Sequence, residues 1–183
     1  ADIDRLSYYE SPTAVLVDLS LNIFSGGDAA GDTVTGFEEV TGSLFNDTLV
    51  GAASAANSLL GYDGADQLSG LSGDDTLEGG AGADTLNGGA DNDTASYLDR
   101  QGVSLSPARV IVNLTTGAAS GGDAAGDVLI SIENVAGTIF NDVLTGSASA
   151  NILTGDAGND TLKGEDGDDR LFSGLGKDRA EGG

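Results

Sequence analysis

The feature that most constrains this chain is a nine-residue repeat that occurs in two separate blocks. Each copy places an Asp or Asn two residues before an apolar residue, which is Leu in nine of the eleven copies. This polar position is Asp47, Asn57, Asp66, Asp75, Asp84 and Asp93 in the first block and Asp142, Asn151, Asp160, Asp169 and Asp178 in the second. One extra residue near 52–56 breaks the step. A fixed short period predicts a solenoid in which every copy adds one layer to a continuous core.

Each repeat has a Gly-rich half and a short half around the apolar residue. Glycine accepts the positive φ values of a tight turn, so the Gly-rich half is predicted to turn and only about three residues around the Leu to be extended. The alternation in Val15–Leu19 and Val110–Leu114 also indicates strands, and helical periodicity is absent. We therefore expect an all-β chain in which two repeats form one coil and the Leu side chains point inward from two opposed parallel sheets.

Four copies fit the pattern G-G-x-G-x-D-x-U-x, in which U is a large apolar residue. They are Gly61–Ser69, Gly70–Glu78, Gly79–Asn87 and Gly155–Lys163. On these residues the chain resembles the RTX family of hemolysin-type calcium-binding repeats, and the resemblance covers nearly the whole chain. It implies a right-handed parallel β-roll or β-helix solenoid, and it implies secretion by a type I export system.

A longer repeat is superposed on the short one. Val15–Leu19 returns as Val110–Leu114, and Gly42–Asp47 returns as Gly137–Asp142, both at an offset of 95. We predict two tandem RTX modules, stacked or in series. The first spans 1–96, with a leading coil at 1–41 and a nonapeptide roll at 42–96. The second spans 97–183, with a leading coil at 97–136 and a roll at 137–183.

Two local departures from the repeat carry predictions of their own. Ser7–Tyr8 returns as Ser96–Tyr97 at an offset of only 89, which places a six-residue insertion around 101–107. This insertion is predicted to be a surface loop. Ala95 and Ala180 replace the inward Leu in the last repeat of each block, and we expect them to mark where the rolls end.

The charge of the chain restricts its partners. Thirty acidic residues face seven basic ones, for a formal net charge of -23. This balance argues against nucleic acid as a partner, and it makes a compact state self-repelling unless cations neutralise it. Cys, His, Met and Trp are absent, which excludes disulfides and soft-metal sites. Calcium remains as the expected cofactor, because it takes six to eight oxygen ligands in loose geometry.

All eleven polar positions are candidate calcium ligands. Stacking of each turn on the turn two repeats later pairs Asp47 with Asp66, Asn57 with Asp75, Asp66 with Asp84, Asp75 with Asp93, Asp142 with Asp160, Asn151 with Asp169 and Asp160 with Asp178. This pairing predicts about seven ions in the rolls. Asn57 and Asn151 offer oxygen without charge, so sites that use them should be weaker. Asp32 and Asp127 are either further ligands or plain Asp turns.

The leading functional hypothesis is a noncatalytic calcium-binding module of a secreted, extracellular bacterial protein that folds when calcium binds. An enzyme is not expected, because His and Cys are missing and no carboxylate pair stands out among the acids. One alternative is a polysaccharide-binding accessory module of a carbohydrate-active enzyme, in which Tyr8, Tyr9, Tyr62 and Tyr97 could stack on sugars; another is an adhesin spacer. The chain lacks an apolar run of about 20 residues that would span a membrane. It begins and ends within repeat units, so we expect it to be part of a larger secreted polypeptide.

Overall fold

The computed structural model describes residues 3–98 and 108–183, in which short β-strands are the dominant element. The strands before residue 97 are β1 (Arg5–Ser7), β2 (Leu16–Asp18), β3 (Ile23–Ser25), β4 (Glu39–Thr41), β5 (Thr48–Val50), β6 (Ser58–Asp63), β7 (Gln67–Ser72), β8 (Thr76–Ala81), β9 (Thr85–Ala90) and β10 (Thr94–Ser96). Those after it are β11 (Ile111–Asn113), β12 (Ala118–Ser120), β13 (Val128–Ile130), β14 (Asn134–Ala136), β15 (Val143–Thr145), β16 (Ile152–Thr154), β17 (Thr161–Lys163), β18 (Arg170–Phe172) and β19 (Arg179–Glu181). Two single 3-10 turns, η1 (Gly27–Ala29) and η2 (Gly122–Ala124), complete the fold. No helix in these described ranges is long and apolar enough to cross a membrane.

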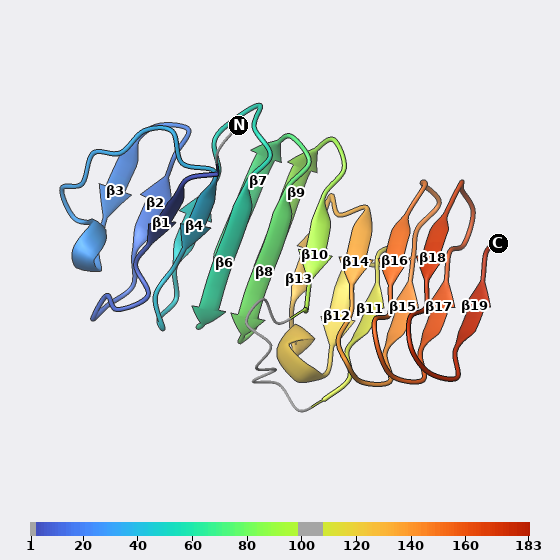
Figure 1. The fold of residues 1–183 in the computed structure, drawn as a ribbon. Helices are drawn as coiled ribbons and strands as arrows, with labels where there is room; N and C mark the ends of the chain where they lie inside the picture. Colours follow the sequence, from blue (N-terminus) through green and yellow to red (C-terminus); the bar gives the residue numbers. More distant parts are fainter. Residues whose placement is uncertain (1–2, 99–107) are drawn as a thin grey trace.

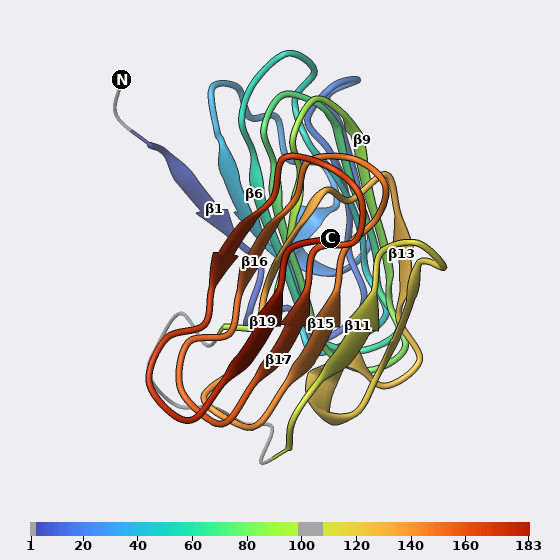
Figure 2. The ribbon, with the colours of Figure 1, turned by 90° about the vertical axis from the view of Figure 1, so that its right-hand side faces the viewer.

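The strands build two long sheets along one axis (Figure 1). One sheet has eight strands in the order β1-β4-β6-β8-β10-β14-β16-β18, and the other has eleven in the order β19-β17-β15-β11-β12-β13-β9-β7-β5-β2-β3. Pairing is parallel throughout the repeats and antiparallel at β2–β3, β11–β12 and β12–β13. Figure 2 looks along the stack and shows the coils one behind another. The expected all-β parallel roll is therefore confirmed.

The apolar residue of each repeat forms the core. The register sets Leu59 beside Leu77 in one sheet and Leu68 beside Leu86 in the other, and all four side chains are at most 1% exposed. Residues alternate between the two faces of a strand, so the residues on either side of each Leu point away from the core. Each coil contributes only two such side chains, which makes a narrow core that depends on its neighbours for burial.

Ala95 does not interrupt the inward row, although it is smaller than the Leu it replaces. It is fully buried in β10, where it lies beside Leu77 on one side and Val135 on the other. The backbone ladder carries the stacking, and a smaller apolar side chain continues the inward row without breaking it. Ala180 lies exposed in β19, which is the edge strand of its sheet, and its role at the end of the second roll stays a prediction.

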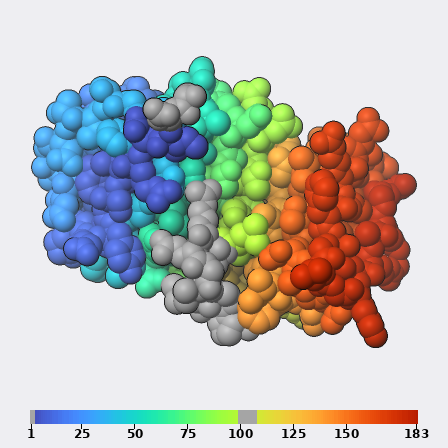
Figure 3. All heavy atoms as spheres, in the orientation of Figure 1, coloured from blue at the N-terminus to red at the C-terminus, as the bar shows by residue number. Residues whose placement is uncertain are grey.

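Both sheets run through the predicted boundary between the modules. Strand β9 pairs with β13, and β10 pairs with β14, so the first roll continues directly into the second leading coil. The colours of Figure 3 accordingly follow the sequence from one end of the molecule to the other. The division at 96/97 stays a prediction about the sequence, and the predicted insertion around 101–107 lies outside the described residues.

Candidate metal centre

Every polar position stands immediately before a strand. Asp66 precedes β7 and Asp84 precedes β9, and the other nine have the same place. Because residues two apart point to the same face of a strand, each polar side chain is directed inward together with the Leu that follows. Asp66 is 1% exposed and Asp93 is fully buried, whereas Asp169 and Asp178, near the end of the stack, are only half-buried.

Hydrogen bonds connect the polar positions of neighbouring coils. The backbone N–H of Asp47 donates to Oδ1 of Asp66 at 2.7 Å, and the N–H of Asp66 donates to Oδ1 of Asp84 at 2.8 Å. The same bond joins Asn57 to Asp75, Asp75 to Asp93, Asp142 to Asp160, Asn151 to Asp169 and Asp160 to Asp178. The structure thus brings together all seven pairs that the repeat predicted, through a bond that occupies one oxygen of each acceptor carboxylate.

The other carboxylate oxygen, Oδ2, has no hydrogen-bond donor in six of these residues, although it is buried. The six are Asp66, Asp75, Asp84, Asp93, Asp160 and Asp169. A buried acceptor without a donor costs about 1–3 kcal/mol, and more when it is charged. Folded proteins leave few such groups unpaired. Six unpaired carboxylate oxygens at equivalent positions therefore indicate that these carboxylates bind a ligand.

Backbone carbonyl oxygens border the same spaces. A Cβ atom placed on Gly61 would lie 2.2 Å from Asp66 Oδ2 and 2.5 Å from the carbonyl oxygen of Gly79. At Gly164 the corresponding distances are 2.2 Å to Asp169 Oδ2 and 2.4 Å to the carbonyl oxygen of Gly182. Because glycine has no side chain, a carboxylate oxygen and a carbonyl oxygen lie beside it without a hydrogen-bond donor between them. A donor set made only of oxygen suits a hard cation such as calcium.

Acidic side chains do not cluster at these spaces. Across residues 3–98 and 108–183, no three acidic side chains gather closely enough to form a ready-made metal cage. A cation between two coils would therefore draw one orphaned Oδ2 from a turn and complete its shell with carbonyl oxygens. This composition is within the range that calcium accepts, because its ligands include backbone carbonyls as well as carboxylates.

Burial raises the pKa of several of these carboxyl groups. It raises the pKa of Asp66 to about 7, against the opposing effect of the Asp47 N–H. Burial likewise raises the pKa values of Asp84 and Asp93 to about 6. A buried carboxylate that retains its proton towards neutral pH is one whose charge lacks compensation. The electrostatics and the missing hydrogen bonds thus point to the same deficit of positive charge.

In the first turns of each block the polar oxygens do have donors, although burial also raises the pKa of Asp142. Asp47 Oδ2 accepts the Ser43 N–H, and the Ser43 hydroxyl donates to Asp47 Oδ1 at 2.8 Å. Thr138 makes the same bonds to Asp142. Every polar side-chain atom of Asn57 and Asn151 is also hydrogen-bonded. These four predicted ligands lie in the ladder, but they present no orphaned oxygen to a cation.

Asp32 and Asp127 occupy different environments despite their equivalent sequence positions. Asp127 is 3% exposed; it accepts the Asp84 N–H at 2.9 Å and the Tyr97 hydroxyl at 3.0 Å. Asp32 is exposed and accepts the Tyr8 hydroxyl at 2.7 Å. Sequence reasoning missed this tyrosine pairing. Tyr8 and Asp32 are 24 residues apart, and Tyr97 and Asp127 are 30 residues apart. The difference equals the length of the six-residue insertion, and this equality was the signal available in the sequence.

Glu133 is a second residue whose role was missed. Its Oε2 accepts the Asp93 N–H at 3.0 Å and so takes the place of an Asp in the ladder where the first roll meets the second leading coil. Glu38 accepts the Asp4 N–H at 3.1 Å in the same way. The offset of 95 between the two glutamates is that of the long repeat, but a Glu outside the nonapeptide pattern gives no sign of this function.

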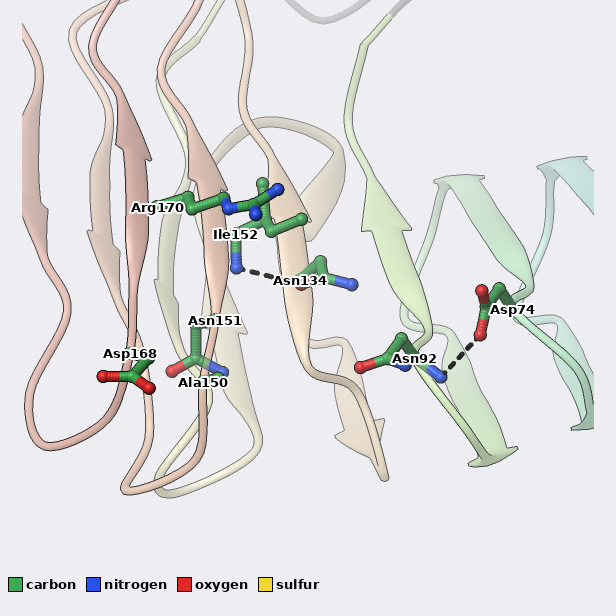
Figure 4. Close-up of a pocket in the computed structure, with 8 residues that line it drawn as sticks. All are labelled: Asp74, Asn92, Asn134, Ala150, Asn151, Ile152, Asp168 and Arg170. Carbon is green, nitrogen blue, oxygen red and sulfur yellow. Dashed lines mark hydrogen bonds between the residues drawn. The ribbon is translucent and has the colours of Figure 1, made fainter.

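A surface hollow of about 380 Å³ lies where the two blocks meet. Its lining comprises Asp74, Asn92, Asn134, Ala150, Asn151, Ile152, Asp168 and Arg170. Figure 4 shows the carboxylates of Asp74 and Asp168 at opposite ends of the hollow, so its acidic groups do not converge on one point. It offers no alternative to the spaces between the turns as a metal centre.

A family model described as RTX calcium-binding nonapeptide repeat (4 copies) matches residues 60–95, 132–162 and 145–180. No curated protein is significantly similar to the chain. All six carboxylates with an orphaned Oδ2 lie within the matched residues. Residues 60–95 and 132–180 of the chain are thus RTX calcium-binding nonapeptide repeats.

Proposed function

We propose that this chain is a noncatalytic calcium-binding module of a secreted bacterial protein and that it folds outside the cell when calcium binds. The observation that carries this proposal is the series of six buried Oδ2 atoms without donors. The proposed ligands are Asp66, Asp75, Asp84, Asp93, Asp160 and Asp169, together with carbonyl oxygens of the turns. Bound calcium supplies positive charge between successive coils.

The residues of the chain prepare the site in two steps. The N–H of one polar position holds Oδ1 of the next, as Asp66 does for Asp84, and this bond fixes the orientation of the carboxylate. Glycines such as Gly79 then leave space beside Oδ2, because any side chain there would collide with it. Each site would bridge two coils, so that metal binding and stacking reinforce one another.

The energetic scale is sufficient to couple binding to folding. With a dissociation constant of about 10⁻⁴ M, about 1 mM calcium stabilises a site by roughly 1.4 kcal/mol. Six such sites contribute roughly 8 kcal/mol, which lies within the range of about 5–15 kcal/mol for the whole stability of a typical domain. Six divalent ions would also offset roughly 12 of the 23 net negative charges.

The export role follows from the same affinities. Sites that bind at about 10⁻⁴ to 10⁻³ M, as in extracellular calcium modules, stay empty at low calcium and fill at high calcium. A chain with this response remains unfolded before secretion and folds after it. The type I export route comes from the family resemblance.

A sugar-binding role has less support. Tyr8 and Tyr97 are buried and donate their hydroxyls to Asp32 and Asp127, so their rings cannot stack on a ligand. Tyr9 and Tyr62 remain, as a tilted ring pair with centroids 4.8 Å apart. The polysaccharide-binding and adhesin-spacer alternatives stay predictions, and we propose neither.

Calcium titration of chelator-treated protein tests the proposal. Isothermal titration calorimetry should show several ions bound, and circular dichroism should show strand signal gained over the same concentration range. Magnesium at equal concentration is the control, since its demand for regular octahedral geometry fits these turns poorly. A strand signal that is complete in chelator and unchanged by calcium would contradict the proposal.

A further inference from the structure

The side-chain amide nitrogen of Asn57 lies among four oxygen atoms. Nδ2 is 3.0 Å from the carbonyl oxygen of Ala52, 2.8 Å from that of Ala55 and 3.3 Å from that of Gly70. It is also 2.9 Å from Oδ1 of Asp75, the acceptor on the next coil. This shell of carbonyl and carboxylate oxygens has the composition of a calcium shell, and a hydrogen-bond donor stands inside it.

In the other turns an acceptor has this place. A Cβ on Gly51 would lie 2.7 Å from Asn57 Nδ2 and 3.0 Å from the Gly70 carbonyl oxygen. A Cβ on Gly61 would meet Asp66 Oδ2 and the next coil's carbonyl oxygen in the same arrangement. Nδ2 of Asn57 therefore corresponds to the orphaned Oδ2 of Asp66. Two acceptors face each other at Asp66, whereas a donor and an acceptor face each other at Asn57.

The neighbours of Asn57 fix the orientation of its amide. Its Oδ1 accepts the Ala52 N–H at 2.9 Å. Turning the amide over would lose this bond and set Oδ1 against the four oxygens that now surround Nδ2. The side chain cannot supply an oxygen to a cation in this space without that loss.

The corresponding turn of the second block pairs its amide with the protein but orients it the other way, because a Cβ on Gly146 would meet Asn151 Oδ1 and the Gly164 carbonyl oxygen, each at 2.4 Å. Asn151 Nδ2 donates to the Glu133 carbonyl oxygen at 2.7 Å, and Asn151 Oδ1 accepts the Ser147 N–H at 2.6 Å. In the same two coils, Ser43 and Thr138 satisfy the aspartates of the preceding turns. Each roll thus begins with one coil whose polar atoms are paired within the protein.

We propose that the Asn57 turn takes no calcium ion, because its amide N–H groups replace the cation, and that the first coil of the first roll is independent of calcium. This inference rests on the proposed calcium function of the other turns. It replaces the expectation of a weak site at Asn57 with the absence of a site there.

A metal-free first coil gives the calcium-dependent coils a surface on which to stack. In a solenoid each repeat is stabilised by its own interactions and by its nearest neighbours. The Asp75 turn, for example, already receives the Asn57 N–H on its Oδ1 and lacks only its cation. Calcium-driven folding of the first roll would then extend from the Asn57 coil and need not begin with an isolated turn.

Two reciprocal substitutions test the inference, with bound ions counted by native mass spectrometry of calcium-loaded protein. Asn57→Asp places an acceptor among the four oxygens, and we expect it to bind one ion more than the wild type. Asp66→Asn places a donor where Oδ2 stood, and we expect one ion fewer, with less loss of strand signal in chelator than the wild type shows.

The outcomes separate the two proposals. A wild-type count retained by Asp66→Asn would overturn the inference, because an amide would then be a competent ligand. A folded Asn57→Asp protein with an unchanged count would overturn it as well. If Asn57→Asp does not fold even with calcium, Asp66→Asn alone decides. A wild-type protein that binds no calcium would instead refute the proposed function.

Discussion

The backbone N–H of Asp84 donates to Oδ1 of Asp127 at 2.9 Å, across 43 residues of sequence. Asp84 belongs to the predicted first roll, and Asp127 belongs to the predicted leading coil of the second module. The bond continues the ladder by which successive nonapeptide turns are joined, and β9 pairs with β13 beside it. The contact between the modules therefore repeats the contact between two coils of one roll.

Replacing Asp127 should weaken the whole molecule. Asp127→Ala removes the acceptor of two buried donors, the Asp84 N–H and the Tyr97 hydroxyl, and should lower the free energy of unfolding by about 2–4 kcal/mol. Urea denaturation of the calcium-loaded protein measures this loss. Asp32→Ala is the matched control and should cost no more than about 1 kcal/mol, because Asp32 is exposed. Equal losses in the two variants would contradict a special role for the junction.

Gly61→Ala should remove one calcium ion without changing any charge. The new Cβ would lie 2.2 Å from Asp66 Oδ2, so the side chain would fill the space that the carboxylate and carbonyl oxygens share. Calorimetric titration should show one ion fewer than in the wild type. Gly182→Ala is the control, because a Cβ there meets no atom within 4 Å, and its ion count should not change. A full count in Gly61→Ala would place the ion elsewhere.

Leu77→Ala should destabilise the protein strongly. Leu77 is fully buried between Leu59 and Ala95, and truncation of a buried Leu costs about 2–5 kcal/mol. Leu175 is 78% exposed, so Leu175→Ala should change stability by less than about 0.5 kcal/mol. Thermal unfolding in saturating calcium compares the two. A small effect of Leu77→Ala would show that the narrow core adds little to the metal and the backbone ladder.

Acid should partly substitute for calcium. Burial raises the pKa of Asp66 from 3.8 to about 7 and that of Asp127, also by burial first, to about 7. Between about pH 4 and 7 the folded state therefore binds protons that the unfolded chain has released, and the stability of the calcium-free fold decreases as the pH rises through this window. In chelator, the strand signal in circular dichroism should be greater at pH 5 than at pH 8. Asp66→Asn should flatten this dependence, and a greater signal at pH 8 would reverse the assigned sign.

Most of the fold, including the register of the paired strands, could be predicted from the repeat. The eleven Asp or Asn positions with an apolar residue two places later predicted the inward row, the two parallel sheets and all seven stacked pairs, because both period and facing are local properties of a short strand. The end of the first roll at Ala95 stays a prediction, but the sheet does not end there. The size of a side chain does not reveal that β14 will continue the ladder beyond it.

The candidate site could be predicted less completely. The repeat predicted which carboxylates lie near one another. It gave no means of telling which of the polar positions have an oxygen free for a metal ion. Ser43 and Thr138 donate to Oδ2 of the aspartates four residues later, so these oxygens are not orphaned. At Asn57, carbonyl oxygens accept from the side-chain amide nitrogen. Those contacts result from the path of each turn, and no residue pattern specifies that path. Glu133 was missed for the same reason, whereas the Tyr97 pairing had a signal in the six-residue insertion.

The pairing of β9 with β13 and of β10 with β14 also governs how the molecule bends. Both sheets cross its middle at once, so flexing there would rupture two backbone ladders together and expose Ala95 and Leu129 to water. Among the described residues these two ladders leave no hinge at the junction, so this part of the molecule is a rod that lengthens by about 4.8 Å per coil. Every coil contributes to the stiffness of the rod. Removal of the proposed calcium ions would therefore make many coils flexible at once.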